Sequence, residues 1–449
     1  MKKLIETLSN IWKIEELRQR ILLTLGLIAI YRVGTFITLP GIDPSALATV
    51  KSQGAGGILG LVNLFAGGAF SRASVFALGI MPYISASIAI QLLTIVVPYF
   101  QKLQKEGESG RRLINQYTRW LTVAVTTFQG MGYVVYLTNV DGEAILISPT
   151  LFAISTVIVL TTGTLFVMWM GERITDKGLG NGISLLIMVG ILARLPEALI
   201  QEFSSRLKSG GMIVFVVEIA FLLVVIAACI LLVQGTRRIP VQYAKRNIVQ
   251  GGRMMQAGGV RQYLPLKINA AGVMPIIFAQ AIMFLPATIA QFLPGFDQNS
   301  KFLIAFNDIR SVPYNITYFI LIVAFTYFYT ALIINPVQIA DDLKRNNGFI
   351  PGVKPGKPTA MFIDAVISRI TLPGALFLGF VAIMPALVML VGVQQSFALF
   401  YGGSSLIIMV GVILDTLQNI ETHLLNRHYD GLTSSGRIKG RQGYAMASM

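Results

Sequence analysis

Long apolar runs recur along the whole chain of 449 residues. Each is close to the roughly 20 residues that a helix needs to cross the hydrocarbon core of a membrane. Charged residues make up only 13% of the sequence, about half the share typical of soluble domains. The alternating segments of a membrane β-barrel are absent from the sequence. We therefore predict an all-α polytopic membrane protein with ten transmembrane helices, at residues 21–39, 74–97, 120–138, 150–170, 183–203, 212–233, 269–292, 315–335, 370–391 and 402–420.

Basic residues divide unequally between the two sets of connecting segments that these spans define. One side, which includes both termini, holds 28 of the 36 lysines and arginines, and the other side holds six. Cytoplasmic loops carry the excess of Lys and Arg in membrane proteins. The sorting predicts that both termini are cytoplasmic, and it accounts for much of the net charge of +15.

Two similar hexapeptides mark equivalent places in the predicted topology. GIMPYI at 79–84 lies in span two, and GVMPII at 272–277 lies in span seven. Five spans per half would make the second half enter the membrane in the opposite direction, so the halves would be pseudo-symmetric and inverted. We predict a first half at 1–207 and a second half at 208–449. Pro82 and Pro275 are expected to interrupt their spans, either as parts of a working centre or as ordinary membrane-helix prolines.

The segment at 58–72, ILGLVNLFAGGAFSR, is apolar but too short to cross a membrane. Irregular backbone at membrane depth survives only inside protein or beside a water-filled cavity. The segment is therefore expected to be a re-entrant or interfacial piece. An amphipathic helix on the surface is the alternative.

Residues for catalysis or metal binding are scarce. The sequence has one cysteine and two histidines, and it has no GxxxxGK[ST] phosphate loop. We expect no catalytic residues, no metal site, no cofactor and no ATP hydrolysis by the chain itself. Glu218 and Asp415 are isolated acids within spans, and helix packing or interfacial anchoring is favoured over an ion path for both.

In place of polar or catalytic residues, the spans in and around the repeated hexapeptides carry isoleucines at helical spacing. Ile80 and Ile84 share one helix face, as do Ile183 and Ile187. Branched aliphatic side chains around a constriction exclude water and ions by dewetting. Lipid contact or ordinary packing is the simpler explanation of such pairs, and spacing alone does not decide.

Two predicted cytoplasmic loops, at 234–268 and 336–369, are longer than topology requires. Both mix basic residues with apolar and turn residues. A basic protrusion binds ribosomal RNA phosphates or an acidic groove on a motor protein. Contact with anionic lipid, or a purely topological role, is the alternative.

The chain resembles the SecY family, the channel subunits of the bacterial protein translocase, over nearly its whole length. The segments that carry the resemblance are LPGID at 39–43, FSRASVFALGIMPYISAS at 70–87, KEGESGRR at 105–112, GLGNGIS at 178–184, YAKR at 243–246, FIPGVKPG at 349–356 and YGGSS at 401–405.

The resemblance implies two halves that form a clamshell around an hourglass pore. By motif alignment, the ring that seals the pore would be Ile80, Ile84, Ile183, Ile187, Ile277 and Ile408. The plug, a re-entrant helix before span two, would include Leu61, Asn63, Leu64, Phe65, Gly67 and Gly68. Spans two and three would face seven and eight as a lateral gate, with contacts from Pro82, Ser85, Gln129, Pro275 and Gln280.

The resemblance also implies partners and a location. The two basic loops would dock the ribosome or the SecA ATPase through Arg237, Arg238, Lys245, Arg246, Lys344, Arg345, Lys354 and Lys357. The family usually has arginine where this chain has Lys354, and lysine keeps the charge without the bidentate fork. Further partners would be SecE, SecG, signal sequences, nascent chains and membrane lipids, including anionic lipids, at the bacterial plasma membrane.

Function follows as an expectation. The chain would be a passive channel that translocates unfolded secretory polypeptides and releases membrane helices laterally into lipid. A partner ATPase, the ribosome or the proton-motive force would supply the energy. The alternatives are an inverted-repeat secondary transporter for small solutes, which needs a polar midplane site, and an assembly scaffold without a pore.

Overall fold

A computed structural model describes residues 14–44, 63–140, 144–209, 211–243, 246–250, 253–257, 261–280, 282–283 and 308–435. Its helices are α2 (Glu15–Gly34), α5 (Met81–Val96), α6 (Pro98–Lys105), α7 (Glu108–Val140), α8 (Pro149–Lys177), α9 (Gly182–Ser209), α10 (Met212–Gln234), α13 (Val312–Ile333), α14 (Pro336–Arg345), α15 (Lys357–Leu390), α16 (Gln395–Ala398) and α17 (Gly403–Ser435). The strands are β1 (Thr236–Tyr243), β2 (Arg246–Gln250), β3 (Arg253–Ala257), β4 (Arg261–Lys267) and β5 (Gly348–Phe349).

A described helix lies over nine of the ten predicted spans. The remaining span, predicted at 269–292, is helical from residue 274 through 280 and extends beyond the described residues. Six of the described helices are long and apolar enough to cross a membrane, or seven if the bent pair of α5 and α6 counts as one. The prediction of a helical, multi-span membrane fold is confirmed, and the number ten stays a prediction.

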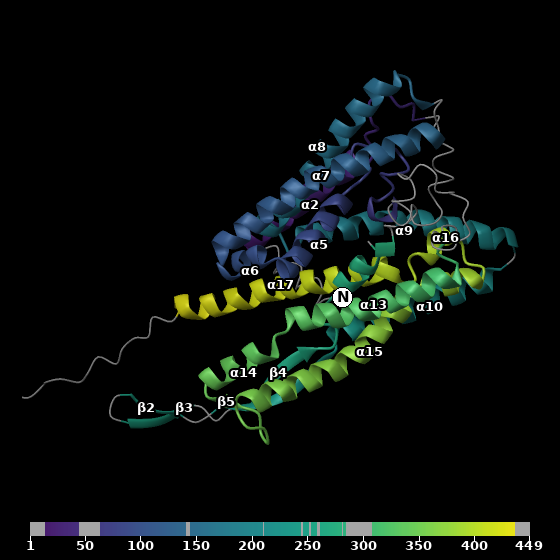
Figure 1. The fold of residues 1–449 in the computed structure, drawn as a ribbon. Helices are drawn as coiled ribbons and strands as arrows, with labels where there is room; N and C mark the ends of the chain where they lie inside the picture. Colours follow the sequence, from purple (N-terminus) through teal and green to yellow (C-terminus); the bar gives the residue numbers. More distant parts are fainter. Residues whose placement is uncertain are drawn as a thin grey trace, which may run out of the picture.

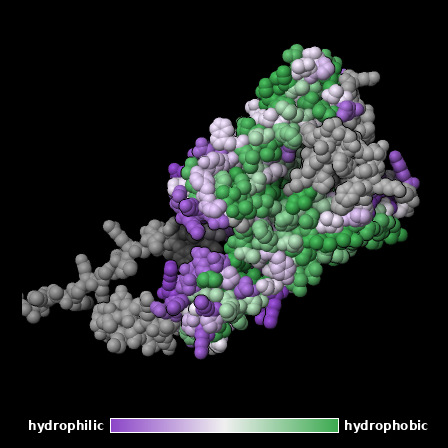
Figure 2. All heavy atoms as spheres, viewed as in Figure 1, coloured by the Kyte–Doolittle hydropathy of each residue, from purple (hydrophilic) through white to green (hydrophobic). Residues whose placement is uncertain are grey.

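Large apolar side chains cover the outside of these helices. On α10, Ile213 is 82% exposed, Leu231 is 72% exposed and Val216 is 65% exposed. Hydrophobic residues occupy the middle of the visible face, and hydrophilic residues gather near α6 and around α14 (Figure 2). Because such a surface is stable only against lipid, the helices are placed in a membrane.

The helices pack in two series that meet at α9. The first series runs α5 on α7, α7 on α8 and α8 on α9, with α2 against α8 (Figure 1). In the second, α13 packs on α15, and α15 contacts α17. Helix α9 contacts both α10 and α17, so it is one of the elements through which the two series join.

The connection predicted at 98–119 is helical rather than irregular. Val97 has extended backbone torsions, as the residue before a proline prefers, and α6 departs from α5 at 95°. After a turn at Gly107, α7 begins at Glu108 and runs without a break to Val140. The predicted loop is therefore the end of a helical hairpin.

Strands from both long basic loops form one three-stranded sheet, and β2 and β3 of the first loop pair in a second, two-stranded sheet. Neither sheet was predicted from the sequence. Strand β1 pairs with β4, with Arg238 opposite Pro265, and β1 also pairs with β5, with Tyr243 opposite Gly348. Because β5 comes from the second loop, the two loops share one structure. Beneath the sheet is a hydrophobic cluster from both loops and from α14 and α15: Ile239, Val241, Leu266, Leu343, Ile350, Ile363 and Ile367.

Candidate functional site

The two hexapeptides adopt the same local structure. Gly79 and Gly272 have φ values of 55° and 63°, the left-handed region that favours glycine. In each copy the helix begins two residues later, at Met81 or Met274. Each proline is therefore the second residue of its helix, where its missing N–H has no partner to lose. Our expectation that Pro82 and Pro275 interrupt their spans was wrong, because each one lies in the first turn of its helix.

The helix of span two therefore begins later than predicted. Its helix begins at Met81, with Ile80 as its N-cap, rather than at the predicted residue 74. Residues 73–80 form turns instead of helix. Because both helices start at the hexapeptide, Ile80 is the N-cap of one helix and Ile277 is the fourth residue of the matching one.

All six predicted ring isoleucines belong to one hydrophobic cluster. Ile80, Ile187 and Ile408 are buried, at 3–5% exposure, and Ile84, Ile183 and Ile277 pack against them partly buried. They come from α5, α9, the helix after Gly272 and α17. Two residues of the predicted plug, Leu64 and Phe65, are buried in the same cluster. The structure thus brings these side chains, from both halves of the sequence, into one large buried cluster that many other residues share.

The described part of the predicted plug, residues 63–72, lies inside the helix bundle. Residues 63–71 are buried, and the polar Asn63 is only 2% exposed. This burial excludes the amphipathic surface helix for these residues. Leu61 and the rest of 58–62 lie outside the described residues.

Glycines on three helices make room for this segment and for the turns that follow it, up to residue 76. A Cβ on Gly190 of α9 would overlap the carbonyl oxygen of Phe65, and one on Gly163 of α8 would overlap that of Val75. A Cβ on Gly34 of α2 would overlap the ring of Phe76. These glycines were missed by the sequence analysis. The available signal was a glycine within a long apolar run, which marks close backbone approach.

Hydrogen bonds fix the same segment to its surroundings. Arg32 of α2 donates Nη1 to the Gly67 carbonyl oxygen at 3.2 Å, and Tyr133 of α7 donates its hydroxyl to the Phe70 carbonyl oxygen at 2.8 Å. Within the segment, the side chain of Asn63 accepts from the Ser71 N–H at 3.1 Å. Gly67 and Gly68 both have positive φ. A short irregular backbone at membrane depth is thereby satisfied by the protein around it.

Four of the predicted gate residues lie on α5 or on the helix after Gly272, which meet each other and α13, and the fifth, Gln129, lies on α7. A buried cluster of Ile88, Ala271, Phe278 and Tyr329 joins these elements. Tyr329 of α13 donates its hydroxyl to Gln91 Oε1 of α5, a contact that the sequence analysis missed. Pro82, Pro275 and Gln280 are buried, Gln129 is half-buried, and Ser85 is half-buried with its hydroxyl bonded to the Met81 carbonyl oxygen at 3.1 Å.

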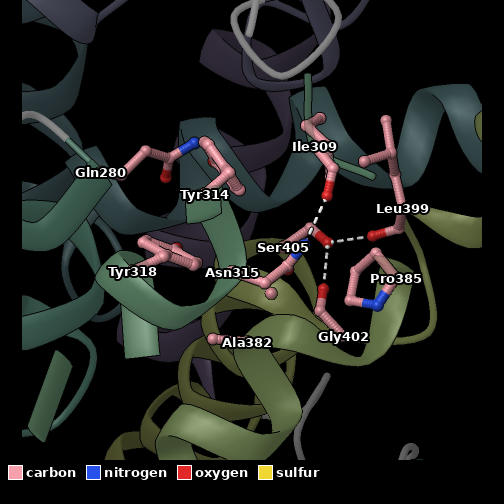
Figure 3. Close-up of a pocket in the computed structure, with 11 residues that line it drawn as sticks. Gln280, Ile309, Tyr314, Asn315, Tyr318, Ala382, Pro385, Leu399, Gly402 and Ser405 are labelled. Carbon is pink, nitrogen blue, oxygen red and sulfur yellow. Dashed lines mark hydrogen bonds between the residues drawn. The ribbon is translucent and has the colours of Figure 1, made fainter. Parts of the chain in front are cut away.

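A small cavity with both apolar and polar lining residues lies beside Gln280 (Figure 3). Its lining includes Tyr314, Tyr318 and Ser405, and Ser405 donates its hydroxyl to the carbonyl oxygens of Leu399 and Gly402. The cavity has a volume of about 20 Å³, which is enough for about one water molecule. It is too small for a solute of metabolite size, so it does not supply the midplane site of a small-solute transporter.

The basic residues of the two loops are presented on and beside the sheet. The six whose side chains are described are all exposed: Arg237, Arg238, Lys344, Arg345, Lys354 and Lys357. Lys245 lies outside the described residues, and only the backbone of Arg246 is described. From Arg238 to Val241 of β1 the burial alternates, with Ile239 and Val241 inward, so Arg238 lies on the outer face, and Arg237 is exposed at the start of the strand. The alternation in TRRIPVQY was the signal that could have revealed this strand.

Comparisons with known proteins agree on one family. The SecY family model matches residues 74–417. A protein translocase subunit SecY from Streptomyces galbus is 43% identical over 429 residues, covering 93% of this chain and 97% of its own length.

Two solved structures share the fold. One is a SecY structure, described as showing that the plug domain stabilises the closed state of the channel and maintains a membrane seal. It has a TM-score of 0.64 at 15% identity. It covers 92% of this chain and 94% of its own. Sec61 from a canine ribosome–channel complex has a TM-score of 0.59 at 15% identity, with the same coverage. By its sequence match and its fold, this multi-pass membrane protein belongs to the SecY family.

Proposed function

We propose that this chain is the protein-conducting channel of a bacterial translocase, closed by an aliphatic ring and by the segment at 63–72. The observation that carries the proposal is the single cluster that joins the six isoleucines to Leu64 and Phe65. A collar of branched aliphatic side chains excludes water and ions when empty. It also yields to a passing polypeptide, because its contacts are non-directional.

The gate in this proposal lies between α5 and the helix after Gly272, with α13 beside it. Its closed state is held by the Ile88–Phe278–Tyr329 cluster and, among the described residues, by the hydrogen bond from Tyr329 to Gln91. An apolar signal sequence inserted there replaces apolar contacts with similar ones. The cost of opening is then mainly the exchange of that hydrogen bond. The 1–207 and 208–449 halves move apart as the segment at 63–72 leaves.

Energy for transport comes from partners in this proposal, with both termini in the cytoplasm. The exposed arginines and lysines of the sheet surface dock the ribosome through rRNA phosphates, or an acidic groove on the SecA ATPase. The canine relative is titled as part of a ribosome–channel complex, which supports the first use. SecE and SecG complete the assembly, and signal sequences, nascent chains and anionic lipids are its other ligands.

Protein translocation is favoured over small-solute transport. The relatives are named translocase subunits, and the cavity at Gln280 holds about one water. A secondary transporter would instead present a polar substrate site near the midplane.

A reversible crosslink across the gate tests the proposal. Gln91→Cys and Tyr329→Cys are placed together in a Cys229→Ala background, since Cys229 is the only cysteine. We expect oxidation to stop translocation of a secretory precursor into proteoliposomes, and reduction to restore it. Each single cysteine variant, oxidised alone, is the control and should stay active. Full translocation by the crosslinked channel would overturn the proposed gate.

A further inference from the structure

A buried ionic cluster lies where α9, α10 and the segment after α15 meet. Arg206 donates Nε to Glu202 Oε1 at 2.8 Å and Nη2 to Glu218 Oε1 at 2.6 Å. The same Nη2 donates to the Gly392 carbonyl oxygen at 2.9 Å, and the Gln394 N–H donates to Glu202 Oε2 at 2.9 Å. The side chains of Glu202, Glu218 and Arg206 are 1%, 8% and 16% exposed.

Among the described residues, the charges in this cluster do not balance. The charged groups found to act on Glu218 in that part of the chain are Arg206 and Glu202, both from α9, and Tyr401 faces it from the segment after α16. Two carboxylates and one guanidinium leave one negative charge in excess. An uncompensated charge in a buried, low-dielectric site is strongly unfavourable, so an ionised pair of carboxylates is a poor description of the folded state.

The hydrogen bonds identify Glu218 as the carboxylate that carries the excess negative charge. Both oxygens of Glu202 accept hydrogen bonds. Glu218 Oε2 is buried and has no partner among the described residues, and the fully buried Tyr401 hydroxyl also has none. Tyr401 stacks against Phe221, one turn from Glu218 on α10. Two complementary polar atoms thus lie unsatisfied in the same small region.

We propose that Glu218 is a proton-binding site, with the proton carried on Oε2 while the cluster is assembled. The proton makes the cluster neutral and turns an orphan acceptor into a donor. A metal ion fits less well, because Glu218 Oε2 and the Tyr401 hydroxyl are the only free oxygens found there among the described residues, and cations such as Ca²⁺ take six to eight. The cluster ties α9 to α10 and to residues 392–394, so its proton controls how firmly these elements are held.

Two isosteric variants separate a protonated carboxyl from an ionised one. Glu218→Gln keeps an acceptor for Arg206 and places an NH₂ where the proton would be. Glu202→Gln, the matched control, replaces an acceptor that is in use with a donor. In the full-length chain, assembled in its membrane complex, we expect E218Q to melt close to wild type and E202Q to melt several degrees lower. Equal destabilisation of the two variants would overturn the proposal.

Infrared spectroscopy measures the proton directly. The carbonyl stretch of a protonated carboxylic acid should be present in wild type at about pH 7, lost in E218Q and retained in E202Q. Absence of the band in wild type, which is the result for a charged and hydrated Glu218, would contradict the proposal, as would a band that survives E218Q. Neither readout requires a translocating chain, so the result is independent of the proposed function.

Discussion

At the scale of single residues, the protein positions an irregular segment at membrane depth by leaving side chains out. Gly34, Gly163 and Gly190 stand where the backbone or a ring of residues 65–76 touches α2, α8 and α9. In addition, Arg32 and Tyr133 donate hydrogen bonds to two carbonyl groups of the segment. Close approach and polar satisfaction together make a buried, non-helical segment stable.

Gly190→Ala tests the close contact between α9 and the backbone of the segment at 63–72. Its Cβ would meet the Phe65 carbonyl oxygen, a backbone atom that cannot rotate away. We expect the segment at 63–72 to shift, with a loss of about 1–3 kcal/mol in stability. Labelling of a cysteine at Ser71, which is 5% exposed, should become faster.

Gly26→Ala is the matched control for that variant. It lies on α2, and a Cβ there would have nothing within 4 Å. Alanine is favoured over glycine within a helix by about 1 kcal/mol, so this change should be neutral or stabilising. If G190A left labelling at position 71 as slow as in G26A, close packing at Gly190 would not be what holds the segment.

Tyr329→Phe isolates the hydrogen bond between Tyr329 and Gln91 across the proposed gate. The variant keeps the ring in the Phe278 and Ile88 cluster but removes the donor to Gln91. Loss of such a bond within a membrane costs about 1 kcal/mol, which shifts the gate about fivefold toward open. The measurement is the rate of disulfide formation between cysteines at 88 and 278, which should fall. Tyr327→Phe, a partly exposed tyrosine on the same helix, should not change that rate. An unchanged rate in Tyr329→Phe would show that the Tyr329–Gln91 hydrogen bond does not hold the proposed gate closed.

At the scale of elements, hydropathy predicted the helices well because span length and lipid contact are set by composition. Their ends were predicted less well. The start of α5 depends on the left-handed Gly79 and on Pro82 in the first turn, and hydropathy carries no such information. The repeated hexapeptide was found in the sequence as a pattern, and its physical meaning, a helix start, became visible only in the structure.

The sheet at the basic loops was not predicted, since its pairing joins residues more than one hundred positions apart. Gln242 and Tyr243 pair with Phe349 and Gly348. One consequence is that described basic residues of both loops lie on or beside one sheet. Charges held on a sheet act together on a partner, whereas charges on two free loops would each lose conformational entropy on binding.

Charge reversal at Arg237 and Arg238 tests this surface. Both are exposed on β1, so the fold should be unaffected. We expect weaker ribosome binding and a shallower dependence of log affinity on log salt, by about one for each phosphate that is no longer neutralised. Arg310→Glu, an exposed arginine far from the sheet in sequence, is the control and should bind as wild type does. If the variant with both arginines reversed bound the ribosome as tightly as wild type at the same salt concentration, Arg237 and Arg238 would have no docking role.

At the scale of the whole molecule, two helix series are joined at α9, and both supply side chains to one central cluster. Motif resemblance supplied the isoleucines, and the structure brings all six into that cluster. The sequence could not show their common environment, because isoleucine pairs in lipid contact have the same spacing. Nor could it supply Gly190, Gln91 and Tyr329, whose roles arise from contacts across helices.

The resting conductance of the channel in planar bilayers tests the central claim most directly. Ile80→Asn and Ile277→Asn each place an amide in the aliphatic cluster, and Ile320→Asn makes the same change at a residue of α13 that is 59% exposed. We predict ion leak from the first two variants and none from the third, since a polar group wets a constriction only where one exists. Resting conductance in Ile80→Asn and Ile277→Asn as low as in Ile320→Asn would contradict the aliphatic seal.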